Sequence, residues 1–135
     1  MKKTFKQLVE IDSIIGNMYE KNDKLELSKF GYAYKRFAEK NYYPHLKEYQ
    51  QKIQDARIDK ALEDSETKAI ITDKENPRGY KYNKEGLKNL IKEENRLSDE
   101  WDIKEFEIES FYCKEENLPE LSDEQREKLT GILIK

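Results

Sequence analysis

The side chains best suited to chemistry are scarce, because the chain has one histidine, His45, and one cysteine, Cys113. A general base, a nucleophile–imidazole pair or a histidine-rich metal cluster would all depend on His45. It follows Pro44 on a polar stretch, and we interpret it as a solvated helix residue. Cys113 precedes Lys114, and a nearby cation can lower the pKa of a thiol. A small, partly buried residue at a strand end is the better interpretation.

Carboxylates are the remaining candidates, since they alone can bind Mg²⁺ or Ca²⁺ or act as an acid–base pair. The densest clusters lie at 93–94, 99–102 and 115–116, and none has the alternating ligands and glycine of an EF-hand loop. The five glycines are scattered, so no glycine-rich phosphate loop is present. We therefore expect a protein that is not an enzyme and that holds no metal and no cofactor.

Tyrosine is the least ordinary residue type, with nine copies, five of them between Tyr32 and Tyr49 among several cations. Three uses remain open, in this order: core packing, a protein interface, and stacking on unpaired bases with the cations on phosphates. The candidate interface follows helical spacing and consists of Phe30, Tyr34, Phe37, Tyr42, Leu46, Tyr49 and Ile53.

Charge is segregated along the chain, although the net charge is only −3. Residues 68–92 hold seven basic and three acidic side chains, whereas residues 93–127 hold four basic and fourteen acidic ones. Glu105, Glu107 and Glu109 would share one strand face, which suits either a solvated sheet surface or a docking face for a basic partner. Head-to-tail contact between copies and neutralisation within one chain are both open.

The secondary-structure elements that place these candidate residues are expected to be mainly helices. Thr4 and Gln7 match a capping box at the start of a helix reaching about residue 20. A long helical pattern then runs from 28 to about 63, and the stripe slips next to Pro44, which predicts a kink or two helices meeting near 41–43. Two further helices are expected at 84–101 and, after the capping box of Ser122 and Gln125, at 123–130.

The period changes between these helices. Residues 69–72 and 79–82 are β-prone and flank a turn at 76–79, which predicts a hairpin. Residues 103–113 alternate, and this strand is expected to join the hairpin. The fold class is therefore α+β, mainly helical: a long helix that Pro44 either kinks or divides, an N-terminal helix, a small antiparallel three-stranded sheet and two more helices. We expect a single domain over 1–135, with a helical arm at 1–64 and a small α+β body at 65–135.

Composition limits the core. Charged residues make up 41% of the chain, against an average of about 25%. No apolar run approaches the roughly 18 residues of a transmembrane helix, and the N-terminus lacks the apolar segment of a signal peptide. A core this thin is expected to rely on a partner.

The layout resembles a family of small tailed-phage proteins of unknown function, encoded among virion and tail morphogenesis genes. The resemblance covers residues 27–134 and is one of order and spacing, without a catalytic signature. It rests on the long helix at 28–41 with Leu46 and Tyr49, the hairpin end at 79–82, the helix at 87–97, the strand at 106–108, and the ending at 118–121 and 129–134.

This resemblance implies a phage or prophage protein without enzymatic activity, acting in virion assembly through protein–protein contacts. The implied partner is a phage structural protein or a second copy, in the host cytoplasm or in the virion, with no membrane. The first alternative is an inhibitor of a host defence protein, with a host protein as partner. The second is single-stranded nucleic-acid binding, the least favoured of the three.

Overall fold

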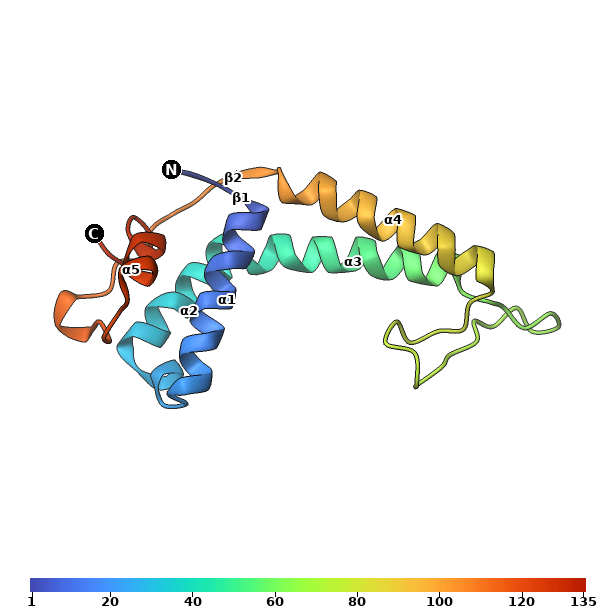
Figure 1. The fold of residues 1–135 in the computed structure, drawn as a ribbon, viewed down its shortest axis with the longest axis horizontal. Coiled ribbons are helices and arrows are strands. Elements are labelled where there is room, and N and C mark those ends of the chain that lie inside the picture. The colour runs from blue at the N-terminus through green and yellow to red at the C-terminus, as the bar shows by residue number, and fades with distance from the viewer. The chain divides into compact units, whose positions relative to one another are not determined.

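The computed structural model describes residues 1–135 and divides them into two compact units (Figure 1). The first unit combines Met1–Leu46 with Asp102–Lys135, and the second is Lys47–Trp101. These bounds differ from the expected arm and body, because the last 34 residues, 102–135, pack with the N-terminal helices. The single domain over 1–135 stays a prediction.

The first unit begins with strand β1 (Lys2–Thr4) and helix α1 (Phe5–Lys21). The predicted capping box is confirmed: the Thr4 hydroxyl accepts from the Gln7 amide, and the Gln7 side chain accepts from the Thr4 amide. This arrangement satisfies amides that the first helical turn leaves without partners. The buried face of α1 recurs at helical spacing, as predicted, and consists of Phe5, Leu8, Ile11, Ile15 and Met18.

The expected long helix is two helices, α2 (Lys29–Asn41) and α3 (Tyr43–Lys60), preceded by a 3₁₀ turn at Leu25–Leu27. Ser28 caps α2 by accepting from the Gly31 amide. Tyr42 separates the helices with a non-helical backbone, φ −122° and ψ −54°. Pro44 then lies in the first turn of α3, where its missing N–H costs no helical bond. The helix is therefore interrupted at Tyr42, before the proline.

The sheet has two strands, so the predicted three-stranded sheet is wrong. Strand β2 (Glu105–Glu107) pairs antiparallel with β1, and Lys3 lies opposite Phe106. The later part of the predicted strand bonds to the C-terminal tail: the amides of Phe111 and Cys113 donate to the carbonyls of Ile132 and Leu133. The N-terminal strand and the apolar tail therefore occupy the backbone that we expected the hairpin to pair with.

The segment at 61–83 lies in the second unit and contains no continuous strand. One isolated antiparallel bridge, Thr72 with Tyr80, joins the two predicted strands of the hairpin, and a second, Glu63 with Ile70, joins the first of them to a residue before it. The predicted turn is present, since the Gly79 amide donates to the Asn76 carbonyl at 2.8 Å. Gly79 has φ +88°, a left-handed conformation that glycine adopts without strain.

Helix α4 (Lys84–Asp102) follows this segment and runs antiparallel beside α3 (Figure 1). In the first unit, a 3₁₀ turn (Glu115–Asn117) leads to α5 (Asp123–Leu129), where the predicted capping box of Ser122 and Gln125 is confirmed. The tail docks as predicted, with Ile132, Leu133 and Ile134 buried.

The apolar core is concentrated in the first unit, where α1 and α2 lie side by side (Figure 1). In the second unit the buried apolar residues are Leu90, Leu97 and Trp101, all on α4, and α3 contributes none. None of the helices combines the length and the apolar character that a membrane span requires.

Candidate functional site

The first four residues of the expected interface belong to the core. Phe30, Tyr34, Phe37 and Tyr42 expose between 0% and 4% of their surface. They pack against α1: the Tyr42 ring lies 6.0 Å from that of Phe5, and the Tyr34 hydroxyl donates to Asp12 at 2.6 Å. We expected these four residues to contact another subunit, but the chain buries them itself, so that expectation is corrected. Leu46, Tyr49 and Ile53 are half-buried.

Another face of α2 carries the exposed aromatic surface. Tyr32 exposes 62% of its surface, and Tyr112, on the segment after β2, exposes 50%. Both line a groove of about 440 Å³ that lies within the first unit. We call it the tyrosine groove, and its lining comprises Lys29, Tyr32, Ala33, Arg36, Phe111, Tyr112, Cys113, Lys114 and Asn117.

The tyrosine groove is positively charged. Lys29, Arg36 and Lys114 line it, and no acidic side chain does. The Arg36 guanidinium lies 5.0 Å from the centre of the Phe111 ring, a cation–π distance that fixes the cation at the groove wall. When a partner binds such a surface, the tyrosine rings can bury a large apolar area while the neighbouring cations pair with carboxylates of the partner.

The groove could have been found from the sequence. Residues 29, 32, 33 and 36 follow one another at steps of three, one and three, so they share a helix face distinct from the stripe of Phe30, Tyr34 and Phe37. Sequence reasoning missed it by following the more continuous aromatic stripe. Nothing local indicated that Tyr112 would join this face, because residues 111–113 are placed by their bonds to the tail.

The expected acidic face is present in the first unit. Glu105, Glu107 and Glu109 are exposed, while Phe106 and Ile108 between them are half-buried. Glu107 also lies 3.3 Å from the N-terminal amine. The alternation therefore places three carboxylates on one side of an extended segment.

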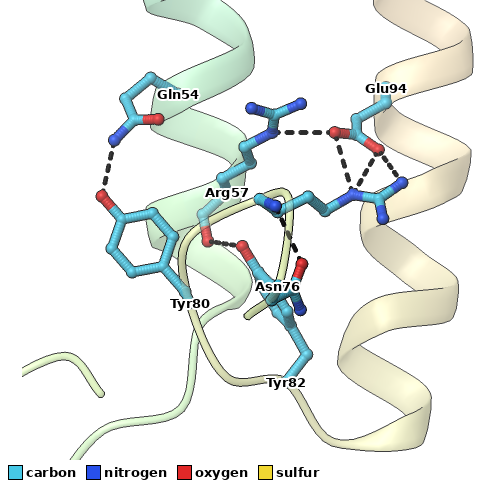
Figure 2. A network of polar contacts seen from close by, with 7 residues as sticks. Gln54, Arg57, Asn76, Tyr80, Tyr82 and Glu94 are labelled. Carbon is cyan, nitrogen blue, oxygen red and sulfur yellow. Dashed lines mark hydrogen bonds and ion pairs between the residues drawn. The ribbon is translucent and has the colours of Figure 1, made fainter. Parts of the chain in front are cut away.

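The second unit contains a network of polar contacts between helices and loop (Figure 2). Glu94 on α4 accepts from two arginines: Arg57 Nε at 3.0 Å, and Arg78 through Nε at 3.0 Å and Nη2 at 2.8 Å. Two tyrosines of the loop reach α3, as the Tyr80 hydroxyl accepts from Gln54 and the Tyr82 hydroxyl donates to the Arg57 carbonyl. The loop at 61–83 is thereby held against both helices.

Glu94 stays ionised in this network. Burial acts to raise the pKa of Glu94, but the hydrogen bonds from Arg78 and Arg57 outweigh it and lower the pKa below its usual range. At neutral pH the carboxylate is thus a negative charge between two positive ones.

The two residues suited to covalent or acid–base chemistry take up structural positions. His45 is half-buried and stacks on Phe106 with ring centres 3.7 Å apart, so it is less solvated than we expected. Cys113 is half-buried, and burial raises the pKa of its thiol, opposite to an activated cysteine. No group of three His, Cys, Asp or Glu side chains is arranged to hold a metal ion.

Comparisons with family models, curated proteins and solved structures found no match to this chain.

Proposed function

We propose that the protein is a non-enzymatic structural or assembly component of a tailed-phage or prophage virion, acting through protein–protein contacts. The observation that carries this proposal is the tyrosine groove, where two exposed tyrosines stand among three cations. Aromatic side chains and arginine are the residues that dominate the energetics of protein interfaces. The groove suits an acidic segment of a phage structural protein or of a second copy.

The contact is tested by the double variant Tyr32→Ala with Tyr112→Ala, expressed in place of the wild-type protein during phage production. We expect the wild-type protein in purified particles, or in an oligomer by analytical ultracentrifugation, and the double variant in neither. Ile91→Ala, an exposed apolar residue on α4 in the other unit, is the control and should behave as wild type. A monomeric wild-type protein that is absent from particles would overturn the proposal.

A second candidate function is inhibition of a host defence protein, which the exposed row of Glu105, Glu107 and Glu109 favours. Such a row offers like charges at every second residue, a surface complementary to a basic, nucleic-acid-binding partner. The test is co-purification from host lysate with wild type and with the three glutamates changed to glutamine. Capture of a nucleic-acid-binding host protein by wild type alone supports inhibition, whereas capture of phage structural proteins only argues against it.

A further inference from the structure

A polar cleft of about 850 Å³ lies between α3 and α4 within the second unit. Its lining holds three basic side chains and one carboxylate, so the cleft carries a net positive charge. Neutral groups that can donate or accept hydrogen bonds occupy much of the remaining wall. The residues that matter here are Lys47, Gln50, Gln54, Arg57, Asn95 and Ser98.

In the network around Glu94, the positive charge of Arg57 is the one that is not balanced. Arg78 pairs with both oxygens of Glu94, at 2.8 to 3.3 Å, and so balances its charge. Arg57 adds a single bond to Glu94, from Nε at 3.0 Å. One positive charge is therefore in excess among these three side chains.

The terminal nitrogens of the Arg57 guanidinium are placed so that they can bind a ligand. The Nε bond of Arg57 to Glu94 fixes the plane of the guanidinium, and in Figure 2 the dashed line to Glu94 leaves from Nε, with no line drawn to either terminal nitrogen. These nitrogens make no hydrogen bond within the protein, and the side chain is 32% exposed. The terminal edge of a guanidinium matches the two oxygens of a carboxylate or phosphate.

The neutral residues extend this edge along the cleft. Gln50 and Gln54 precede Arg57 at steps of four and three on α3, so all three share a helix face. Asn95 and Ser98 lie three residues apart on α4, on the other wall. Amides and a hydroxyl at these places can bind the hydroxyl groups of a small molecule whose anionic group lies on Arg57.

We propose that this cleft binds an oxyanion, the phosphate or carboxylate group of a small polar molecule, with Arg57 as the principal ligand-binding residue. The proposal does not depend on the function proposed above, because the cleft and the tyrosine groove lie in different units.

The test is isothermal titration calorimetry of the full chain with two probes, inorganic pyrophosphate and citrate, at about 0.15 M ionic strength, where exposed charges are screened. We expect wild type to bind at least one probe, and Arg57→Gln to bind it at least about tenfold more weakly. Lys52→Gln removes the same charge from an exposed position of α3 outside the cleft, and should leave binding within about twofold.

A second variant keeps the test decisive if Arg57→Gln disturbs folding. Asn95→Asp adds a negative charge to the cleft wall at an exposed residue with no part in the Glu94 network, and should weaken binding several-fold. Binding of pyrophosphate alone assigns a phosphate ligand, citrate alone assigns a carboxylate, and both support the shared chemistry. No binding by wild type, or equal weakening by Lys52→Gln and Arg57→Gln, overturns the proposal.

Discussion

Two tyrosines of α2 differ in burial and in the hydrogen bonding of their hydroxyl groups. Tyr34 and Tyr32 lie two residues apart, yet Tyr34 is 3% exposed and its hydroxyl donates to Asp12, whereas Tyr32 is 62% exposed. A buried hydroxyl requires a partner, because leaving it unpaired costs free energy that folding must offset. The Asp12 carboxylate therefore lets tyrosine occupy a core position of α2.

Removing the Tyr34 hydroxyl should destabilise the fold without changing its shape. We expect Tyr34→Phe to lower the free energy of unfolding by about 1–2 kcal/mol, since a hydrogen bond to a carboxylate is lost. Urea denaturation measures the change. Tyr32→Phe is the matched control and should stay within about 0.5 kcal/mol of wild type. Equal stability of Tyr34→Phe and wild type would contradict the assigned bond.

The same burial predicts how stability changes at alkaline pH. Burial raises the pKa of Tyr19 and Tyr42 to about 12, and burial together with the bond to Asp12 also raises the pKa of Tyr34. Unfolded tyrosine loses its proton near pH 10, so above that pH the folded state holds more protons and stability falls.

This loss should begin near pH 10 and continue through pH 12. Urea denaturation at a series of pH values measures it as a slope, and Tyr34→Phe should reduce the slope by about one proton because one titrating hydroxyl is gone. An unchanged slope in Tyr34→Phe would show that lysines and other groups account for the pH dependence.

At the scale of elements, Asn41 joins the end of α2 to the segment after β2. Its side-chain amide donates to the Phe37 carbonyl at 2.9 Å and to the Glu109 carbonyl at 2.8 Å, and its oxygen accepts from the Glu109 amide at 2.7 Å. Asn41 is 4% exposed and is the one buried polar residue of the chain. The side chain thereby pairs both backbone groups of Glu109, as a neighbouring strand would.

Asn41→Ala should therefore cost more than an average substitution. Three hydrogen bonds are lost and two backbone groups of Glu109 lose their partner, so we expect a loss of about 2–4 kcal/mol in the free energy of unfolding. Urea denaturation again provides the measurement. Asn89→Ala, at an exposed position of α4, is the control and should be neutral or slightly stabilising, since alanine favours helix. A neutral Asn41→Ala would contradict this structural role.

At the scale of the whole molecule, the two units differ in how much apolar surface they bury. α1 buries five residues in the first unit, whereas α3 buries none and the second unit relies on Leu90, Leu97 and Trp101. Polar contacts of Glu94 join α4 to α3 and to the loop in this unit. Regions with few buried apolar contacts open at lower free energy.

Hydrogen exchange should reveal this difference in the full chain. We expect amides of α3 at 47–60 and of the loop at 61–83 to exchange faster than those of α1, because fewer apolar contacts must break to expose them. Exchange followed by mass spectrometry resolves these segments. Equal protection of α1 and α3 would mean that the polar network stabilises the second unit as well as an apolar core does.

Local signals predicted the helices well. The capping boxes at Thr4 and Ser122 are formed by residues three positions apart, so the sequence contains both partners of each bond. The alternation of Glu105, Glu107 and Glu109 likewise predicted which side chains are exposed. The candidate interface depends on information that is not local: an apolar stripe at helical spacing identifies a buried face without saying whether this chain or another covers it, and this chain covers four of the seven residues.

The sequence by itself determined where most of the helices begin and which of their faces are apolar, because these follow from residue type and short spacing. Only the tertiary structure decided which segments pair. Strand β1 pairs with β2, Asn41 bonds to Glu109, and Tyr112 lines the tyrosine groove with residues of α2. The partners in each case are far apart in sequence. Such pairings depend on competition among many segments for the same backbone groups and apolar faces, and no local pattern contains that competition.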